Sequence, residues 1–208
     1  HDALPISMIG FVFFTNQFAA QSIITAISAR VPKDSLVLMA GQIAANGEFS
    51  MADSAQKANI YHLFDSLQLY QSALLLIEQD LAGEPYGKSE RFFRLLTHKA
   101  FVFLHMGQFD EAKKIFAGNI DKTLVFAPGI LCPNYGGLAI LYYNQTELDS
   151  SLFYCNLFFD RAMCDSDSNR VAEALNLMAN VYFTKAEYHT ALQHHRRSVP
   201  FADSGRLS

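Results

Sequence analysis

The stretch THKAFVFLHMGQFDEAKKIF, residues 97–116, decides the fold of this chain. Its apolar residues recur at helical spacing on both sides of the interruption at residues 106–108. Gly107 lies in that interruption, where a residue without a side chain enters the left-handed region of backbone conformation at little cost and ends a helix. The stretch therefore predicts two helices joined by a tight turn.

The same pattern recurs four times along the chain. In each unit an aromatic residue is followed six positions later by an aromatic residue or leucine, and three positions after that by a small residue. The anchors are Phe64, Tyr70 and Ala73; Phe103, Phe109 and Ala112; Tyr142, Leu148 and Ser151; and Tyr182, Tyr188 and Ala191, so the units are 39, 39 and 40 residues apart. A period in this range predicts a stack of helix pairs rather than a single closed domain.

The pattern also predicts how the pairs pack. Small residues at Ala100, Ala139 and Ala179 let the paired helix approach closely, and the aromatic three positions later, such as Phe103 or Tyr182, is expected to be a buried wedge. One pair cannot bury its own apolar face, so neighbouring pairs must stack. We expect the turns of the last three units at Gly107, Thr146 and Ala186.

Two of these stretches resemble tetratricopeptide repeats closely. They are residues 97–116 and LNLMANVYFTKAEYHTALQHHRRS, residues 175–198, while residues 138–155 and 61–79 are weaker copies. The period is longer than the family's common unit of about 34 residues and resembles the units of bacterial sensor and regulator proteins and of adaptor solenoids. The resemblance implies an all-α fold, a right-handed α-solenoid of stacked antiparallel helix pairs.

The sequence suggests four segments. Residues 1–7 look like a translated sequencing adapter and are expected to be an artefact, and residues 8–21 resemble a truncated signal peptide, with an apolar first helix of the solenoid as the alternative. Residues 22–49 are expected to form an N-terminal helical segment. Residues 50–208 are expected to form four repeat-like helix pairs, truncated at the C-terminus. The apolar run favours a periplasmic or exported protein, and the alternative is a cytoplasmic one.

Composition argues against several functions. The 208 residues carry a formal net charge of −4, and the only basic run, residues 194–197, is interpreted as a solvated face of the last helix. No clustered basic face is therefore expected to bind nucleic acid. No segment is long and apolar enough to predict a membrane span.

The residues that usually carry chemistry are sparse. Three cysteines without a C-x-x-C pair argue against a zinc site, and Cys155 is expected to be a small core residue with no geometric reason to pair with Cys164. No histidine has a nucleophile and a carboxylate arranged as a triad. We expect neither an enzyme nor a cofactor or metal.

The resemblance implies that the first helix of each pair lines a concave face. The binding positions that match this face are Arg94, Phe101, His105, Tyr143, Asn144, Asn176, Asn180 and Phe183, together with His62, Asp65, Thr97 and Ile140. Their aromatic and amide character suits an extended peptide. We therefore expect a non-catalytic protein- or peptide-binding scaffold, the N-terminal sensory or interaction region of a larger bacterial regulator with a downstream signalling domain. The alternative is a soluble intracellular adaptor that organises a multiprotein complex.

Overall fold

A computed structural model describes residues 35, 38, 68–124 and 127–204, which are helical or in turns, with no strand among them. The chain divides into two compact units, residues 1–83 and 84–208. The predictions for residues 1–7 and 8–21, and those for His62 and Asp65, lie outside the described residues. Of residues 22–49 only Ser35 and Leu38 are described, and both are helical.

In the first unit, most of the described residues belong to helix α5, Tyr70–Ala82. It buries Ala73, Leu76 and Ile77 completely. Gln68, two residues before the helix, has a φ of 59° and therefore lies in the left-handed region. The repeat pattern places the turn between the two helices of the first repeat at this position.

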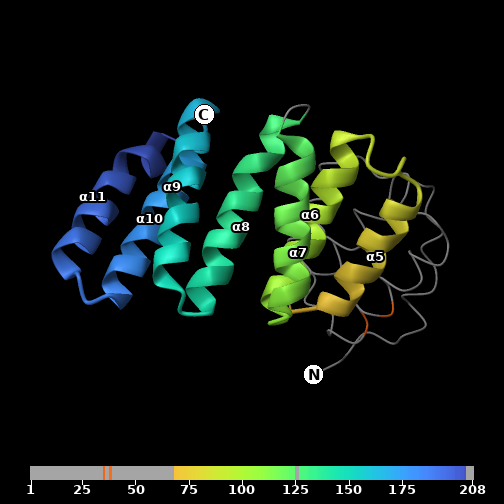
Figure 1. Cartoon of the computed structure of the whole chain (residues 1–208), viewed down its shortest axis with the longest axis horizontal. Helices are drawn as coiled ribbons and strands as arrows, with labels where there is room; N and C mark the ends of the chain where they lie inside the picture. Colours follow the sequence, from red (N-terminus) through yellow and green to blue (C-terminus); the bar gives the residue numbers. More distant parts are fainter. Residues whose placement is uncertain (1–34, 36–37, 39–67, 125–126, 205–208) are drawn as a thin grey trace, which may run out of the picture. The chain divides into compact units, whose positions relative to one another are not determined.

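The second unit contains three antiparallel helix pairs that follow one another in a row (Figure 1). Each second helix also packs against the first helix of the next pair, α7 on α8 and α9 on α10. This arrangement is the predicted α-solenoid of stacked pairs. The pairs are α6 (Glu90–His105) with α7 (Phe109–Thr123), α8 (Leu131–Asn144) with α9 (Leu148–Cys164), and α10 (Ser168–Thr184) with α11 (Tyr188–Ser204), and the 3₁₀ turn η2 (Pro128–Ile130) precedes α8.

The turn inside each of these pairs has one residue in the left-handed region. Gly107, Thr146 and Ala186 have φ values of 75°, 62° and 63°, which confirms the three predicted turn positions. In each turn the following residue donates its backbone N–H to a carbonyl five residues earlier, as Glu187 does to Tyr182 at 2.9 Å. This hydrogen bond is the mark of a Schellman motif, which satisfies carbonyls at the end of the first helix. Two of the three turns therefore place a residue with a side chain where glycine is normally preferred.

The small residues behave as predicted, but the aromatic residues do not. Ala100, Ala139 and Ala179 are fully buried. The prediction that Phe103 and Tyr182 are buried wedges is wrong, because both are partly exposed. In the second and third pairs the aromatic at this position stacks on a side chain of the second helix: Tyr142 on Tyr154, with ring centroids 5.4 Å apart, and Tyr182 on His194, 5.2 Å apart. In the first pair the ammonium group of Lys99, on the same helix, lies 5.6 Å from the centre of the Phe103 ring.

A second set of contacts joins the two helices of each of the three pairs in the second unit, at a constant separation of 22 residues. In the first and third pairs the contact is polar: Asn119 donates to the Thr97 hydroxyl at 3.1 Å, and Ser198 donates to the Asn176 side chain at 2.8 Å. In the second pair it is apolar, because a Cβ at Gly136 would lie 3.2 Å from the Phe158 ring. The contact is thus made either by two polar side chains or by a large ring against a glycine.

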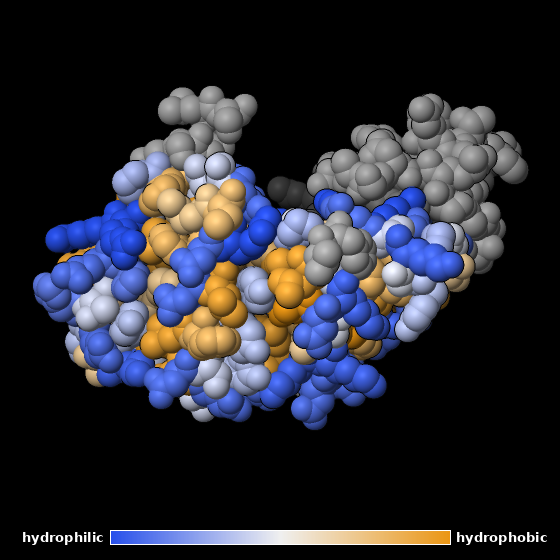
Figure 2. Space-filling model, turned by 45° about the horizontal axis from the view of Figure 1, so that its top comes forward, coloured by the Kyte–Doolittle hydropathy of each residue, from blue (hydrophilic) through white to orange (hydrophobic). Residues whose placement is uncertain are grey.

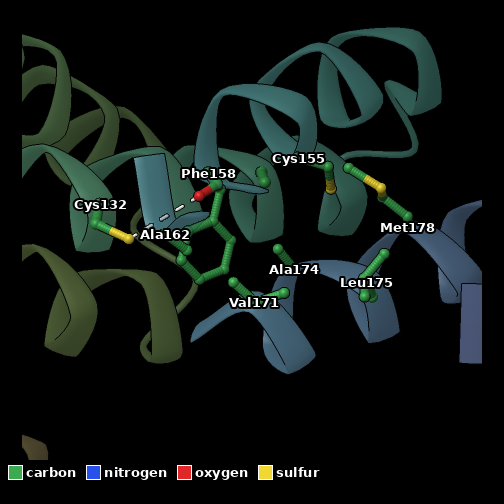
Figure 3. Packing of buried hydrophobic residues seen from close by; sticks show 9 residues of the cluster. Cys132, Cys155, Phe158, Ala162, Val171, Ala174, Leu175 and Met178 are labelled. Carbon is green, nitrogen blue, oxygen red and sulfur yellow. Dashed lines mark hydrogen bonds between the residues drawn. The ribbon is translucent and has the colours of Figure 1, made fainter. Parts of the chain in front are cut away.

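The core between α9 and α10 is shown in Figure 3. Side chains of α9, including Cys155 and Phe158, point toward Val171, Leu175 and Met178 of α10, and all are buried. Cys155 is fully buried, which confirms its interpretation as a small core residue. Burial raises the pKa of its thiol to about 12, so the thiol stays protonated and unreactive at neutral pH.

Candidate functional site

The candidate binding face is formed by the first helices of the three pairs, α6, α8 and α10. Helix α8 contacts both α6 and α10, so the three helices form one continuous surface. Asn134 of α8 donates to the hydroxyl of Thr97 in α6 at 3.1 Å. On the other side, the hydroxyl groups of Tyr143 in α8 and Thr184 in α10 are 3.2 Å apart. The relative positions of the three helices are therefore fixed by side-chain hydrogen bonds as well as by the core.

Helix α6 contributes a basic and aromatic part of this face. Arg94 is exposed and forms an ion pair with Glu90 on its own helix. Phe101 is partly exposed, and one side of its ring packs edge-on against Phe116, with centroids 5.1 Å apart. His105 is exposed at the end of α6, with its ring 6.5 Å from that of Phe101. Of the predicted residues, the structure thus places Phe101 and His105 in contact.

Helices α8 and α10 contribute aromatic and amide groups. Tyr143 is partly exposed, and Asn144, the last residue of α8, is exposed. Asn180 is exposed on α10, and Phe183 has 63% of its surface exposed. The Phe183 ring lies 5.3 Å from that of Tyr188 in an edge-on arrangement, so one edge of the ring is supported while most of its surface remains accessible.

Two of the residues expected on this face are engaged inside the protein. Thr97 is buried, where Asn119 and Asn134 both donate to its hydroxyl group. Asn176 accepts hydrogen bonds from His195 Nδ1, at 3.0 Å, and from Ser198, both in α11. The side-chain oxygen of Asn176 therefore positions α11.

Sequence reasoning did not select Thr184 or the buried amides. Thr184 joins Tyr143 across two helix pairs, and Asn119 and Asn134 form the polar centre between α6, α7 and α8. The signal was present, since both asparagines occupy positions that are apolar in a helix with one buried face. A buried amide must find partners, so such a position predicts a polar contact to a neighbouring helix.

One ion pair links neighbouring helix pairs. Lys185, in the turn after α10, donates to Asp149 at the start of α9, at a distance of 2.8 Å. The hydrogen bond lowers the pKa of Asp149 and raises the pKa of Lys185. Both groups are exposed, so we expect the contact to orient the two pairs rather than to add much stability.

A shallow pocket of about 350 Å³ lies on a different surface, over α6 and α7. Leu96, Phe103 and Ile115 form its apolar part, with Lys99 among the lysines around it. The residue that corresponds to Lys99 in the next pair is Leu138, which packs against α7 in the core. The pocket therefore occupies the stacking surface of the helix pair and is separate from the face of α6, α8 and α10.

The described residues offer little for catalysis. They contain no group of three or more histidine, cysteine, aspartate or glutamate side chains placed to hold a metal ion. Cys132, Cys155 and Cys164 are all free thiols, and burial raises the pKa of the Cys132 thiol as well as that of Cys155. Among the helices that the structure describes, none has both the length and the apolar character needed to cross a membrane.

Comparison with solved structures supports the fold. The chain is similar to BtubC (BKLC) from P. vanneervenii, with a TM-score of 0.60 and 14% identity over 90% of this chain and 89% of the other. It is also similar to a putative kinesin light chain of Podosopora anserina with nearly identical TPR-like repeats. The TM-score is 0.63, at 13% identity, for its Q17M form over 91% of this chain and 95% of the other, and 0.60 for another crystal structure. No protein-family model and no curated protein matches the chain. The fold is therefore TPR-like.

Proposed function

We propose that this chain is a non-catalytic repeat scaffold that binds an extended protein or peptide segment along the face of α6, α8 and α10. The observation that carries the proposal is the exposed aromatic surface of this face, above all Phe183, which is 63% exposed. Aromatic side chains and arginine supply much of the binding energy of protein interfaces.

The TPR-like fold supports the same conclusion, because stacked repeats create extended surfaces that suit elongated ligands.

The composition of the face suggests how such a segment is held. Apolar side chains of the ligand would pack on Phe101, Tyr143 and Phe183, which belong to three successive pairs. The exposed amide of Asn180 has both donors and an acceptor for a peptide backbone. Arg94 would pair with an acidic group by exchanging its partner Glu90 for the ligand.

We also propose a cellular context. The scaffold would be the N-terminal sensory or interaction region of a larger bacterial regulator with a downstream signalling domain, exported to the periplasm. The apolar run in residues 8–21 and the long repeat period support this proposal. The alternative is a cytoplasmic adaptor in a multiprotein complex. Cell fractionation of the natural full-length protein distinguishes them: export with cleavage near Ala20 supports the first, and an intact cytoplasmic protein contradicts it.

The binding face is tested with a selected ligand. Short peptides would be selected from a random displayed library on the wild-type protein, and their affinity would be measured for the double variant Arg94→Ala/Asn180→Ala and for the control Gln193→Ala. All three positions are exposed on helices, but Gln193 lies on α11, a second helix of its pair. We expect the double variant to lose about tenfold or more in affinity, because a hot-spot residue such as a ligand-pairing arginine costs about 2 kcal/mol or more when truncated. Unchanged affinity with unchanged helix content, or an equal loss in the control, contradicts the proposal.

A further inference from the structure

The three first helices align position by position, and this alignment places two opposite charges in one row. Equivalent places in α6, α8 and α10 are held by the fully buried alanines Ala100, Ala139 and Ala179. Six positions earlier, the same helices carry Arg94, Pro133 and Glu173. Arg94 and Glu173 are exposed, and Pro133 is partly exposed. The row therefore runs from a cationic end on α6, over an uncharged residue on α8, to an anionic end on α10.

The anionic end of this row lacks an internal partner. The Glu173 carboxyl group has neither an ion pair nor a hydrogen bond among the described side chains. Arg170, one helical turn earlier, is engaged by Asp167, with its Nε atom 3.2 Å from Oδ2. Although Glu173 is exposed as a residue, partial desolvation of its carboxyl group raises its pKa, against the smaller opposing effect of Arg170. A carboxylate in such surroundings gains more from a cationic partner than one in open water does.

The distance between the two ends of the row suits a short extended peptide. Helix α8 contacts both α6 and α10, so Arg94 and Glu173 are two helix spacings apart. The axes of packed helices lie about 8–10 Å apart, which gives a separation of about 16–20 Å. An extended chain rises about 3.3 Å per residue, so about five or six residues of a ligand cover this distance.

We propose that the face of α6, α8 and α10 selects an extended peptide with two opposite charges about five or six residues apart, the basic one paired with Glu173 and the acidic one with Arg94. The inference rests on the proposed function and adds the charge pattern of the ligand. It also fixes the orientation of the ligand, because the reverse placement would bring like charges together at both ends. Glu173 is the stronger determinant, since Arg94 must first leave Glu90.

The test is a charge exchange between protein and peptide. Among peptides selected from the random displayed library on the wild-type protein, we expect one basic and one acidic residue to be enriched together, about five or six residues apart. The affinity of such a peptide should fall about tenfold or more for Glu173→Lys, because repulsion replaces attraction. A second peptide, with the basic residue changed to glutamate, should bind Glu173→Lys about tenfold or more tightly than it binds the wild-type protein.

The matched control is Glu111→Lys, which makes the same change in net charge at an exposed glutamate of α7, a second helix. It should leave the affinity of both peptides unchanged, and an equal loss there overturns the inference. Selected peptides without a basic residue, or equal binding to Glu173→Lys and to the wild-type protein, also overturn it. If those peptides still lose affinity for Arg94→Ala/Asn180→Ala, the proposed binding face stands without the charge pattern. If they do not, or if the library yields no binder, both proposals fail.

Discussion

At the scale of single residues, the turns between paired helices store backbone strain. Ala186 has a φ of 63° and a side chain, whereas Gly107 holds the equivalent position in the first pair of the second unit without one. The left-handed region costs an ordinary residue about 1–2 kcal/mol. We expect Ala186→Gly to stabilise the protein by up to about 1 kcal/mol, since the relief of strain exceeds the added flexibility of the unfolded chain. Thermal or urea unfolding measures the change.

The matched variant Gly107→Ala is expected to change the stability in the opposite direction. A Cβ at Gly107 would meet no atom within 4 Å, so Gly107→Ala adds backbone strain and no steric overlap. We expect it to destabilise the protein by about 1 kcal/mol. Equal effects of the two substitutions would show that the left-handed turns do not limit stability.

His194 makes stability depend on pH. Its ring stacks on Tyr182, and its Nδ1 atom is buried without a hydrogen-bond partner in the structure. Burial, together with the charges of Arg197 and His195, lowers the pKa of His194. The unfolded chain, with a histidine pKa of about 6.5, therefore takes up a proton before the folded protein does. Stability contributed by neutral His194 is present above that pH and is lost as the pH falls.

The variant His194→Phe isolates this effect, because phenylalanine keeps the stacked ring and cannot be protonated. The free energy of unfolding of the wild-type protein should fall more steeply between about pH 7.5 and 5.5 than that of His194→Phe. Chemical denaturation at a series of pH values gives both slopes. Parallel slopes would mean that the imidazolium form is accommodated in the folded state.

At the scale of helices, α7 and α8 approach each other closely at Gly137. The fully buried ring of Phe116 lies directly on Gly137, and a Cβ at Gly137 would overlap that ring. We expect Gly137→Ala to destabilise the protein by about 1–3 kcal/mol, because an overpacked core must shift. Gly118, inside α7, has no atom within 4 Å of an added Cβ. Gly118→Ala should therefore stabilise α7 by up to about 1 kcal/mol through helix propensity.

Unfolding curves of both variants test this contact. A stability loss in Gly137→Ala that the second substitution Phe116→Leu partly restores identifies the ring as the obstacle. Destabilisation of the same size in Gly118→Ala would instead mean that any alanine in these helices is unfavourable.

The helices and turns could be predicted because each follows from local sequence. The 3.6-residue period places the helices, and the pattern places the turns at Gly107, Thr146 and Ala186 even though two of these residues are not glycine. The identity of the buried ring could not be predicted in this way. Phe103 and Phe116 have similar apolar patterns around them, and only the neighbouring pair, which supplies Gly137, decides which ring is enclosed.

The candidate site could be predicted only in part, because contacts with other helices cannot be read from the local sequence. Periodicity places Arg94, Asn180 and Phe183 on the first helices, where the structure leaves them exposed. Periodicity does not reveal that the Asn176 side chain accepts a hydrogen bond from Ser198, because that contact depends on a residue in another helix. Whether a ligand binds these residues remains a prediction.

At the scale of the second unit, the repeat pattern separates the residues that hold the helices together from the residues that remain available to a ligand. One set of positions, 22 residues apart, holds the helices of each pair together. Another set packs α7 and α9 against the first helix of the next pair. Figure 2 shows hydrophobic residues at the surface among hydrophilic ones. We therefore expect the extended peptide ligand to bind on the first helices, where the side chains are not needed for contacts between repeats.

The most direct test of this account is photo-crosslinking from two matched positions. Phe183 on α10 and Phe153 on α9 are exposed to a similar degree, 63% and 58%, but they lie on a first and a second helix. Each would be replaced in turn by a photoreactive phenylalanine analogue, and the protein irradiated with a peptide selected from the random library. The account predicts efficient crosslinking from position 183 and little from position 153. Crosslinking from position 153 alone would place the ligand on the second helices and contradict it.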